Sequence, residues 1–451
     1  MLLKSITGLS KHFFVSKKSV RCSTLFINGP KATDNYVFLI PYIDLTKVSS
    51  DRELLQDMLS KRQSSYDLNK LEELWNVYQD LKNNGHKYEN MKDKISKQLS
   101  ELYKTQPDSK DIDKLKMQIG LIKDNLKILK SPLWSAEEAA MLQYLELPNL
   151  LHNLTPSTEP VLIYQHLKPD IKNKSHIDIG EKLNLLKYTN NLNYYLKGDA
   201  AVFELGSQFF FSKVLRNHNF TQFSNTDFVK SLIVEGCGTD PTDPKSCLTL
   251  QNSGDEGGTD MRLHLTGASS LFSFFAYHAK NLSLVQSLPL RYFSVGRQYI
   301  PTPEKQSLHS VVQSTCVQTF EATMDSEQLD TSLSETIKLV IDLYSTLNFN
   351  FRLCYVPAHK LQMWESLRLA IEMYSVSLQS FVEVGHISVS GDFISKRLLF
   401  TYMEKKDQKF PHILSGTILN VPKLLACVLE QDKEFVIPSQ LWLHLQDLLY
   451  S

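Results

Sequence analysis

The chain has 451 residues, enough for two or three domains, and its 42% hydrophobic and 22% charged residues are ordinary for a soluble globular protein. Its 49 basic residues balance its 49 acidic ones, so the charge of the whole molecule does not predict a nucleic-acid partner. No stretch reaches the roughly 18 apolar residues of a membrane-spanning helix, and the six scattered cysteines form no CxxC pair, so we expect no membrane insertion, no metal site and no disulfide framework.

The N-terminus concentrates positive charge. Residues 1–33 contain six Lys or Arg residues and no acid, with serines and apolar residues between them. This composition is typical of a mitochondrial transit peptide, and a disordered basic tail is the alternative. We predict a leader over residues 1–24 and a mature protein in the mitochondrial matrix. Without the leader the acids outnumber the bases, so any nucleic-acid binding must come from a local basic surface.

A long helical hairpin dominates the expected N-terminal domain, residues 36–150. A short helix is predicted near residues 51–62. Apolar residues then recur at a spacing of three to four over residues 71–102 and again over residues 112–133. Residues 106–109 interrupt the pattern, with Pro107 ending the first helix. Two such helices predict an antiparallel coiled-coil arm of roughly 40–50 Å.

The outer half of the first arm helix has a basic bias. Contact with RNA and docking of another protein both fit such an arm, and so do lysines that simply face solvent. The residues that we predict to contact RNA are Lys82, Lys87, Lys94, Lys97 and Lys104.

Residues 151–451 are expected to form the second domain. A strand is predicted near residues 161–164 and a strand and turn at residues 231–238. Residues 240–260 are rich in Gly, Pro, Asp and Ser, which predicts an exposed loop. A phosphate-binding role for the glycine-rich residues 254–258 is not expected, because the acids there would repel phosphate. A helix over residues 200–217 is apolar on all sides, which indicates deep core or an intersubunit surface. The candidate interface residues are Phe203, Phe209, Phe210 and Val214.

A hairpin over residues 288–318 carries the strongest motif. Apolar and polar residues alternate on both sides of a loop at residues 301–305. The hairpin resembles motif 2 of class II aminoacyl-tRNA synthetases, specifically of seryl-tRNA synthetases. Residues 194–205, which lead into the helix at residues 200–217, resemble motif 1. The motif 2 positions that match are Leu288, Pro289, Arg297, Leu308, Gln313 and Val317.

The resemblance also identifies the chemical groups that are replaced. Tyr299 stands where the family has a glutamate, and Ala268 replaces the glutamate of the loop that holds the substrate serine. Glu383 is retained in a segment that resembles the ATP-binding strand, whereas Lys423 replaces the arginine of motif 3, and lysine lacks the planar fork of arginine. Further replacements are Ser310, Val312, Cys316 and Gln318.

The resemblance implies an α+β fold: a class II synthetase domain, mostly antiparallel sheet flanked by helices, behind an N-terminal coiled-coil arm. It also implies a dimer, formed with a second copy or with the genuine mitochondrial seryl-tRNA synthetase. The leader, together with the replaced motif residues, makes the chain similar to the seryl-tRNA synthetase-like paralogues of insect mitochondria, which are taken to lack aminoacylation activity. The expected role is therefore binding, without catalysis or a cofactor, in support of mitochondrial translation, with tRNA or another mitochondrial RNA as a further partner.

Two alternatives remain open from the sequence. In the first, Arg297, Glu383 and Lys423 still hold ATP, and the protein is an active seryl-tRNA synthetase with a reworked site. In the second, the protein is a scaffold that binds neither RNA nor a synthetase.

Overall fold

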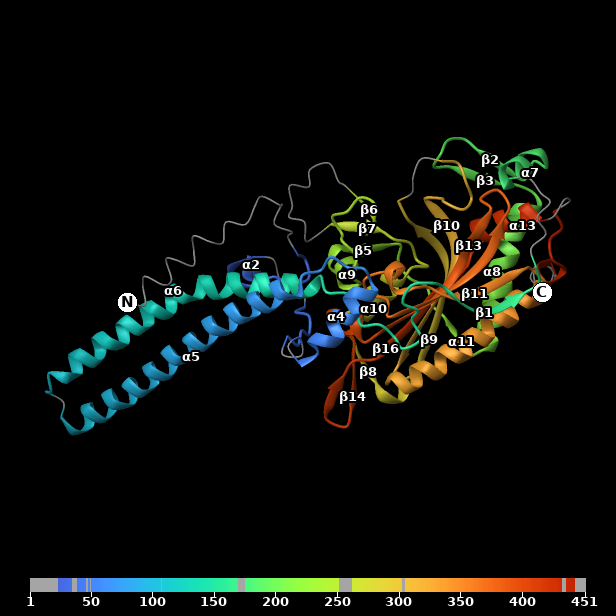
Figure 1. Cartoon of the computed structure of the whole chain (residues 1–451). Helices are drawn as coiled ribbons and strands as arrows, with labels where there is room; N and C mark the ends of the chain where they lie inside the picture. The colour runs from blue at the N-terminus through green and yellow to red at the C-terminus, as the bar shows by residue number, and fades with distance from the viewer. Residues whose placement is uncertain are drawn as a thin grey trace.

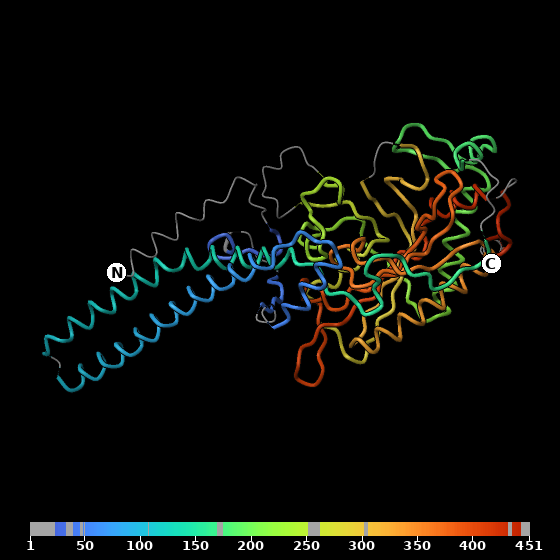
Figure 2. The backbone as a smooth tube through the Cα atoms, in the orientation of Figure 1, coloured from blue at the N-terminus to red at the C-terminus, as the bar shows by residue number. Residues whose placement is uncertain are grey.

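The computed structural model describes residues 23–34, 39–45, 48, 50–106, 108–168, 175–250, 262–301, 305–431 and 435–442. The expectations for Pro107, for the loop at residues 254–258, and for most of the leader lie outside these residues. Figures 1 and 2 show a globular body from which a long helical arm projects. None of the described helices is both long and apolar enough to cross a membrane.

The arm is a pair of antiparallel helices, α5 (Leu68–Thr105) and α6 (Asp111–Leu145). Asp67 caps α5, because its carboxylate accepts a hydrogen bond of 3.1 Å from the backbone nitrogen of Lys70. The residues of the predicted seam are buried or half-buried between the helices, which confirms the coiled-coil prediction. Before the arm come α2 (Gly29–Asp34) and α4 (Arg52–Lys61), the latter confirming the short helix expected there.

The body is built on an eight-stranded sheet in the order β1-β11-β12-β13-β16-β10-β9-β4. All neighbouring strands are antiparallel except β4, which runs parallel to β9. Three helices bury apolar side chains against it, and Phe211, Tyr344 and Leu425 lie in the resulting core. The strands are β1 (Val161–His166), β4 (Thr221–Gln222), β9 (Leu290–Tyr299), β10 (Gln313–Thr323), β11 (Phe351–Tyr355), β12 (Leu367–Ser375), β13 (Ser380–Gly391) and β16 (His412–Asn420), and the helices are α8 (Asp199–Asn217), α11 (Ser326–Thr346) and α13 (Val421–Gln431).

Smaller elements surround this sheet. They form three short sheets of two or three strands each, together with four helices. The short strands are β2 (Leu186–Tyr188), β3 (Tyr194–Leu196), β5 (Phe228–Lys230), β6 (Leu248–Thr249), β7 (Leu263–Leu265), β8 (Leu282–Leu284), β14 (Thr401–Glu404) and β15 (Asp407–Lys409), and the helices are α7 (His176–Lys182), α9 (Ser231–Gly236), α10 (Leu271–His278) and α12 (Phe393–Leu398).

The structure corrects the expectation for residues 231–238. Residues 231–236 form α9, a short helix, and not a strand, whereas the expected turn follows at residues 237–238. A short apolar run does not distinguish a strand from a helix that is buried on every side, and all six residues of α9 are buried. Long-range packing therefore decided the secondary structure of this segment.

The structure also corrects two of the four candidate interface residues on α8. Phe203 and Phe210 are buried in the core of their own subunit, where they cannot meet a partner. Val214 is half-buried against the same core, whereas Phe209 is 39% exposed. The periodicity of α8 did not separate its two apolar faces, because both faces carry aromatic or aliphatic residues.

Candidate functional site

The expected substrate loop and motif 2 hairpin lie against each other. β9 and β10 pair antiparallel, as predicted, with Tyr299 opposite Gln313. Residues 265–269 pack along β9, where the backbone nitrogen of Tyr299 donates to the carbonyl oxygen of Thr266 at 3.2 Å. A side chain at Gly267 would collide with the carbonyl oxygen of Arg297, 2.0 Å from an added Cβ. Glycine at this position therefore allows the loop to approach the strand closely.

Ala268 is held by its backbone within this loop. Its nitrogen donates to the Asp227 carboxylate at 2.9 Å, and its carbonyl oxygen accepts from the Asn225 amide at 3.1 Å. Only a methyl group projects from the position where the resemblance places a glutamate. The loop thus keeps its shape but offers no charge from this side chain to pair with a substrate ammonium group.

Arg297 is neutralised by a residue of its own subunit. Its Nη1 lies 3.2 Å from Oε1 of Glu204 on α8, and both side chains also hydrogen bond to the hydroxyl of Thr315 on β10. The Arg297 side chain is 40% exposed, so it remains solvated. A phosphate would have to compete with a carboxylate that is already in place.

The floor of the site is a network of neutral side chains on β9, β10 and β16. The Gln298 amide donates to Thr417 Oγ1 at 2.9 Å, and Thr417 Oγ1 donates to Gln318 Oε1 at 2.7 Å. All three side chains are buried. Gln318 stands where the resemblance places a glutamate, and its hydrogen bonds are made inside the protein, which leaves the floor uncharged.

Glu383 on β13 is bound by Arg368 on β12. Arg368 Nε donates to Glu383 Oε2 at 3.0 Å, and Arg368 Nη1 lies 2.6 Å from the fully buried Glu365. Ser388 also donates to Glu365 at 2.6 Å. Burial alone would raise the pKa of Glu383, but the Arg368 guanidinium and His386 hold it well below its usual range. Both carboxylates are therefore already paired with one arginine.

Lys423 lies at the start of α13, near a buried cluster that the sequence analysis missed. His176 Nδ1 is 2.6 Å from Glu430 Oε1, and His309 Nε2 is 3.5 Å from the same oxygen. Burial would raise the pKa of Glu430, but hydrogen bonds from both histidines and from two serines hold it well below its usual range. The three residues are far apart in the sequence, so no local spacing could have indicated them.

These groups fit a hydrogen-bonded cluster better than a metal site. Their ligand atoms lie within 4.8 Å of one another, as a metal would require. However, His176 Nε2 accepts from the backbone nitrogen of Leu308 at 3.1 Å, which places the proton on Nδ1, facing Glu430. Two zinc ligands at about 2.0–2.1 Å from the ion are separated by roughly 3.3 Å, wider than the 2.6 Å found here. The cluster ties the segment before β10 to α13.

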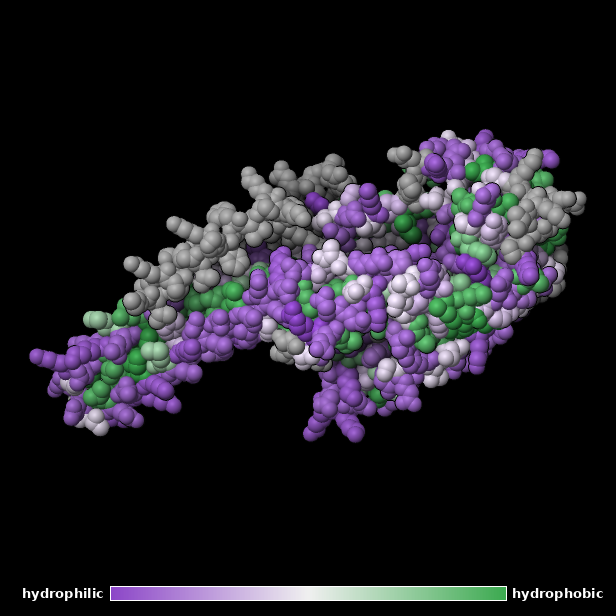
Figure 3. Space-filling view, in the orientation of Figure 1, coloured by the Kyte–Doolittle hydropathy of each residue, from purple (hydrophilic) through white to green (hydrophobic). Residues whose placement is uncertain are grey.

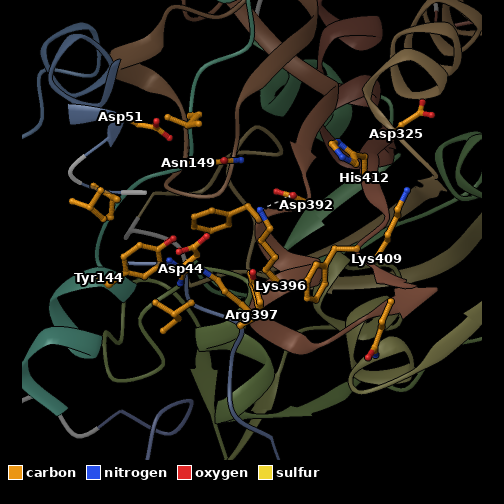
Figure 4. A pocket seen from close by; sticks show the side chains of 18 of the residues that line it. Asp44, Asp51, Tyr144, Asn149, Asp325, Asp392, Lys396, Arg397, Lys409 and His412 are labelled. Atoms are coloured by element: carbon orange, nitrogen blue, oxygen red, sulfur yellow. Dashed lines mark ion pairs between the residues drawn. The ribbon is translucent and has the colours of Figure 1, made fainter. Parts of the chain in front are cut away.

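A cavity of about 760 Å³ lies at the base of the arm. None of the expected catalytic positions lines it. Figure 4 shows Asp44, Tyr144 and Arg397 on one side and His412 on the other. The Arg397 guanidinium donates to the carbonyl oxygen of Leu145 at 2.9 Å and lies 4.0 Å from the Phe393 ring centroid. Arg397 thus joins the arm to the body.

The five predicted RNA-contacting lysines all lie on α5 with exposed side chains. The opposite helix also exposes apolar side chains, at Met117, Leu121 and Ile128. Neither observation identifies a ligand, so contact with RNA stays a prediction.

Comparison with known proteins agrees with this architecture. The family described as tRNA synthetase class II core domain (G, H, P, S and T) matches residues 255–432. The serine--tRNA synthetase-like protein Slimp of Drosophila melanogaster is 33% identical over 465 residues, which cover 98% of each chain. The mitochondrial serine--tRNA ligase of Mus musculus is 26% identical over 423 residues, which cover 88% of this chain and 80% of the mouse protein.

Two solved structures share the fold. The seryl-tRNA synthetase of Pyrococcus horikoshii, complexed with ATP, has a TM-score of 0.78 at 17% identity, covering 89% of this chain and 98% of that one. The cytoplasmic serine-tRNA ligase of Naegleria fowleri, in complex with AMP, has a TM-score of 0.75 at 17% identity, covering 87% of this chain and 94% of that one. These likenesses confirm the expected fold, a class II synthetase domain with a coiled-coil arm.

Proposed function

The chain belongs to the seryl-tRNA synthetase-like family of class II aminoacyl-tRNA synthetases, and we propose that it is a non-catalytic member that acts by binding. Its place of action is the mitochondrial matrix, and its role is to support mitochondrial translation. The relatives named as mitochondrial serine--tRNA ligases and the basic, acid-free leader support this location.

One observation carries the non-catalytic assignment. Two retained charged groups are paired within the chain: Arg297 with Glu204, and Glu383 with Arg368. Adenylate formation needs charges that are fixed and still free to meet ATP, its metal and the amino acid. Ala268 offers no carboxylate. The packing of the fold is kept, whereas the polar groups have been redirected to partners inside the protein.

ATP–pyrophosphate exchange tests this assignment. The chain without its leader is assayed with each amino acid, serine foremost, beside an active mitochondrial seryl-tRNA synthetase as positive control. We expect exchange at the background level for every amino acid. Serine-dependent exchange above background would instead establish the reworked active synthetase, in which Arg297, Glu383 and Lys423 hold ATP.

The proposed partner is the genuine mitochondrial seryl-tRNA synthetase, with a second copy of this chain as the other possible subunit. Paralogues inherit one ancestral interface, so a mixed dimer is physically natural, and an inactive subunit can stabilise an active one by binding only its folded state. Leu205 and Phe209, one turn apart on α8, present exposed apolar side chains for such a contact. Phe209 belongs to the interface predicted from the sequence. Leu205 was not predicted, and we include it because its side chain is exposed.

A second apolar surface supports a role in binding. β1 is an edge strand of the main sheet, and it exposes three consecutive apolar side chains, Val161, Leu162 and Ile163. Figure 3 shows an apolar area on the side of the body where Figure 1 places β1. Exposed apolar edge strands are usually covered or blunted in proteins that work alone.

Contact with tRNA or another mitochondrial RNA is the second candidate role. The exposed lysines of α5 favour it, because an extended arm with positive charge suits a phosphate backbone. Met117, Leu121 and Ile128 on α6 favour docking of a protein instead. Filter binding of mitochondrial tRNA at several salt concentrations distinguishes contact with RNA from docking of a protein. Only binding to a phosphate backbone weakens steeply as the salt concentration rises.

A further inference from the structure

The carboxylate of Glu235 on α9 binds the first described residues of the chain. Its side chain is 5% exposed. Oε1 accepts from the Ser23 hydroxyl at 2.6 Å, and Oε2 accepts from the backbone nitrogens of Thr24 at 2.7 Å and Leu25 at 3.0 Å. The Thr24 hydroxyl donates to Oε2 as well, at 2.8 Å. Four donors from three consecutive residues therefore meet one buried carboxylate.

The same segment connects the arm to the body; we call residues 23–28 the N-terminal strap. The side chains of Leu25 and Phe26 are buried in an apolar cluster with Ile233 of α9 and Leu145 of α6. Asn28 donates to the carbonyl oxygen of Trp134 on α6 at 2.9 Å. Figure 2 shows the chain that follows Ser23 running beside the base of α6. The strap is thus part of the folded protein.

Hydrogen bonds, and no ion pair, hold the Glu235 carboxylate in the described part of the chain. Among those residues, no Lys, Arg or His nitrogen forms an ion pair with it. A buried carboxylate is least costly when it is hydrogen-bonded and also paired with a cation. The hydrogen bonds are present, and a nearby cation would add the second contribution.

We propose that the peptide bond between Cys22 and Ser23 is a processing site, and that the α-ammonium group released on Ser23 is the counter-ion of Glu235. This inference rests on the leader that the proposed function includes. Hydrolysis consumes one water: the carbonyl carbon of Cys22 gains the oxygen and leaves as a carboxylate, and the nitrogen of Ser23 gains hydrogen. At neutral pH that amine is protonated, because an α-amino group has a pKa of about 8.

Covalent geometry keeps the new charge within about 6.5 Å of the carboxylate. Consecutive backbone nitrogens are at most about 3.8 Å apart, and that of Thr24 is already 2.7 Å from Glu235 Oε2. A cut after Thr24, the boundary predicted from composition, would remove three of the four donors and leave only the nitrogen of Leu25. The contacts therefore favour a leader that ends two residues earlier.

The first test is the N-terminal sequence and intact mass of the protein purified from mitochondria. We expect Ser23 as the first residue. A chain that starts at Thr24 or later, or that retains any of residues 1–22, would overturn the inference. This result is independent of pyrophosphate exchange, so a failure of the non-catalytic assignment and a failure of the processing site are distinguishable.

The second test is a thermodynamic cycle on the chain that begins at Ser23. The α-amine of Ser23 is either left free or acetylated, in the parent chain and in Glu235→Gln, and Tm is measured for all four proteins. We expect acetylation to lower Tm by a few degrees at pH 7 and to have little effect in E235Q. Glu73→Gln, an exposed carboxylate on α5, is the matched control and should leave the effect of acetylation unchanged.

The pH dependence provides a readout if E235Q does not fold. Pairing with Glu235 raises the pKa of the amine above its unfolded value of about 8, so its stabilisation is complete below pH 8 and is lost as pH rises through the folded pKa. The Tm difference between free and acetylated chains should therefore disappear at high pH. A Tm that does not respond to acetylation at pH 7, or a difference that persists unchanged to high pH, would contradict the proposal.

Discussion

Arg297 on β9 forms an ion pair with Glu204 on α8, with 3.2 Å between Nη1 and Oε1. The pair joins the motif 2 hairpin to the helix that resembles motif 1, two segments that are about ninety residues apart in the chain. Through this contact Arg297, which the motif resemblance places at a phosphate, is paired within the chain.

The Arg297–Glu204 pair should contribute only modestly to stability. Because Arg297 is 40% exposed, we expect a double-mutant cycle of Arg297→Ala and Glu204→Gln to give a coupling of about 0.5–1 kcal/mol in the free energy of unfolding, decreasing with salt. Urea denaturation at two salt concentrations measures it. Glu335→Gln is a suitable control, because its partner Arg291 also pairs with Glu321. A coupling of zero would show that the contact does not neutralise Arg297.

Arg368 should matter far more. Its removal leaves Glu365 and Glu383 without their shared cation, and Glu365 is fully buried. We expect Arg368→Ala to lower the free energy of unfolding by about 3–5 kcal/mol. The control is Arg352→Ala, which breaks the more exposed Arg352–Glu372 pair on the neighbouring strands. Equal losses for the two variants would contradict the buried-pair interpretation.

The burial of His278 should make the protein less stable in acid. Its side chain lies among aromatic rings, including Phe320 and Phe400, and neither ring nitrogen has a hydrogen-bond partner among the described residues. Burial lowers its pKa from 6.5 to about 4. The histidine is thus neutral when folded, and stability falls as pH drops below 6.5, by up to about 3 kcal/mol at pH 4 and below.

The matched variant is His278→Phe, which fills the same aromatic environment without polar nitrogens. We expect it to be more stable at pH 7 by about 1–3 kcal/mol and to lose this part of the acid sensitivity. Urea denaturation between pH 4 and 7 measures both effects, with His86→Gln on the exposed arm as control. An unchanged pH profile in H278F would show that other groups cause the acid sensitivity.

The exposed face of α8 should determine association. Leu205→Asp combined with Phe209→Asp places two charges on the predicted interface, because both side chains are exposed. We expect the dimer, with itself or with the mitochondrial seryl-tRNA synthetase, to become monomeric in sedimentation velocity. Leu378→Asp, equally exposed in the turn between β12 and β13, should leave the dimer intact. If the α8 variant still dimerises, the interface lies elsewhere, and β1 becomes the next candidate.

The arm lysines should set the salt dependence of RNA binding. Changing Lys82, Lys87, Lys94, Lys97 and Lys104 to Gln is expected to weaken tRNA binding and to reduce the slope of log K against log salt by about one for each lost phosphate contact. In the control variant Lys127 and Lys130, which are exposed on α6, are changed to Gln instead. An unchanged slope in the α5 variant would remove RNA from the proposed role of these lysines.

The sequence by itself determined the arm, because a coiled coil is specified by local apolar periodicity, and α5 and α6 keep the predicted seam. It also determined the β9–β10 hairpin, and it showed that Ala268 carries no carboxylate. These features depend on residue type and short-range spacing, which can be read along one segment.

Only the tertiary structure decided what the retained charges contact. Glu204 pairs with Arg297, Arg368 pairs with Glu383, and Glu235 binds residues 23–25 across more than two hundred positions. Packing likewise made residues 231–236 a helix and directed Phe203 inward but Phe209 outward. Ion pairs and burial join segments that are distant in the chain, and no local pattern encodes which of them will meet.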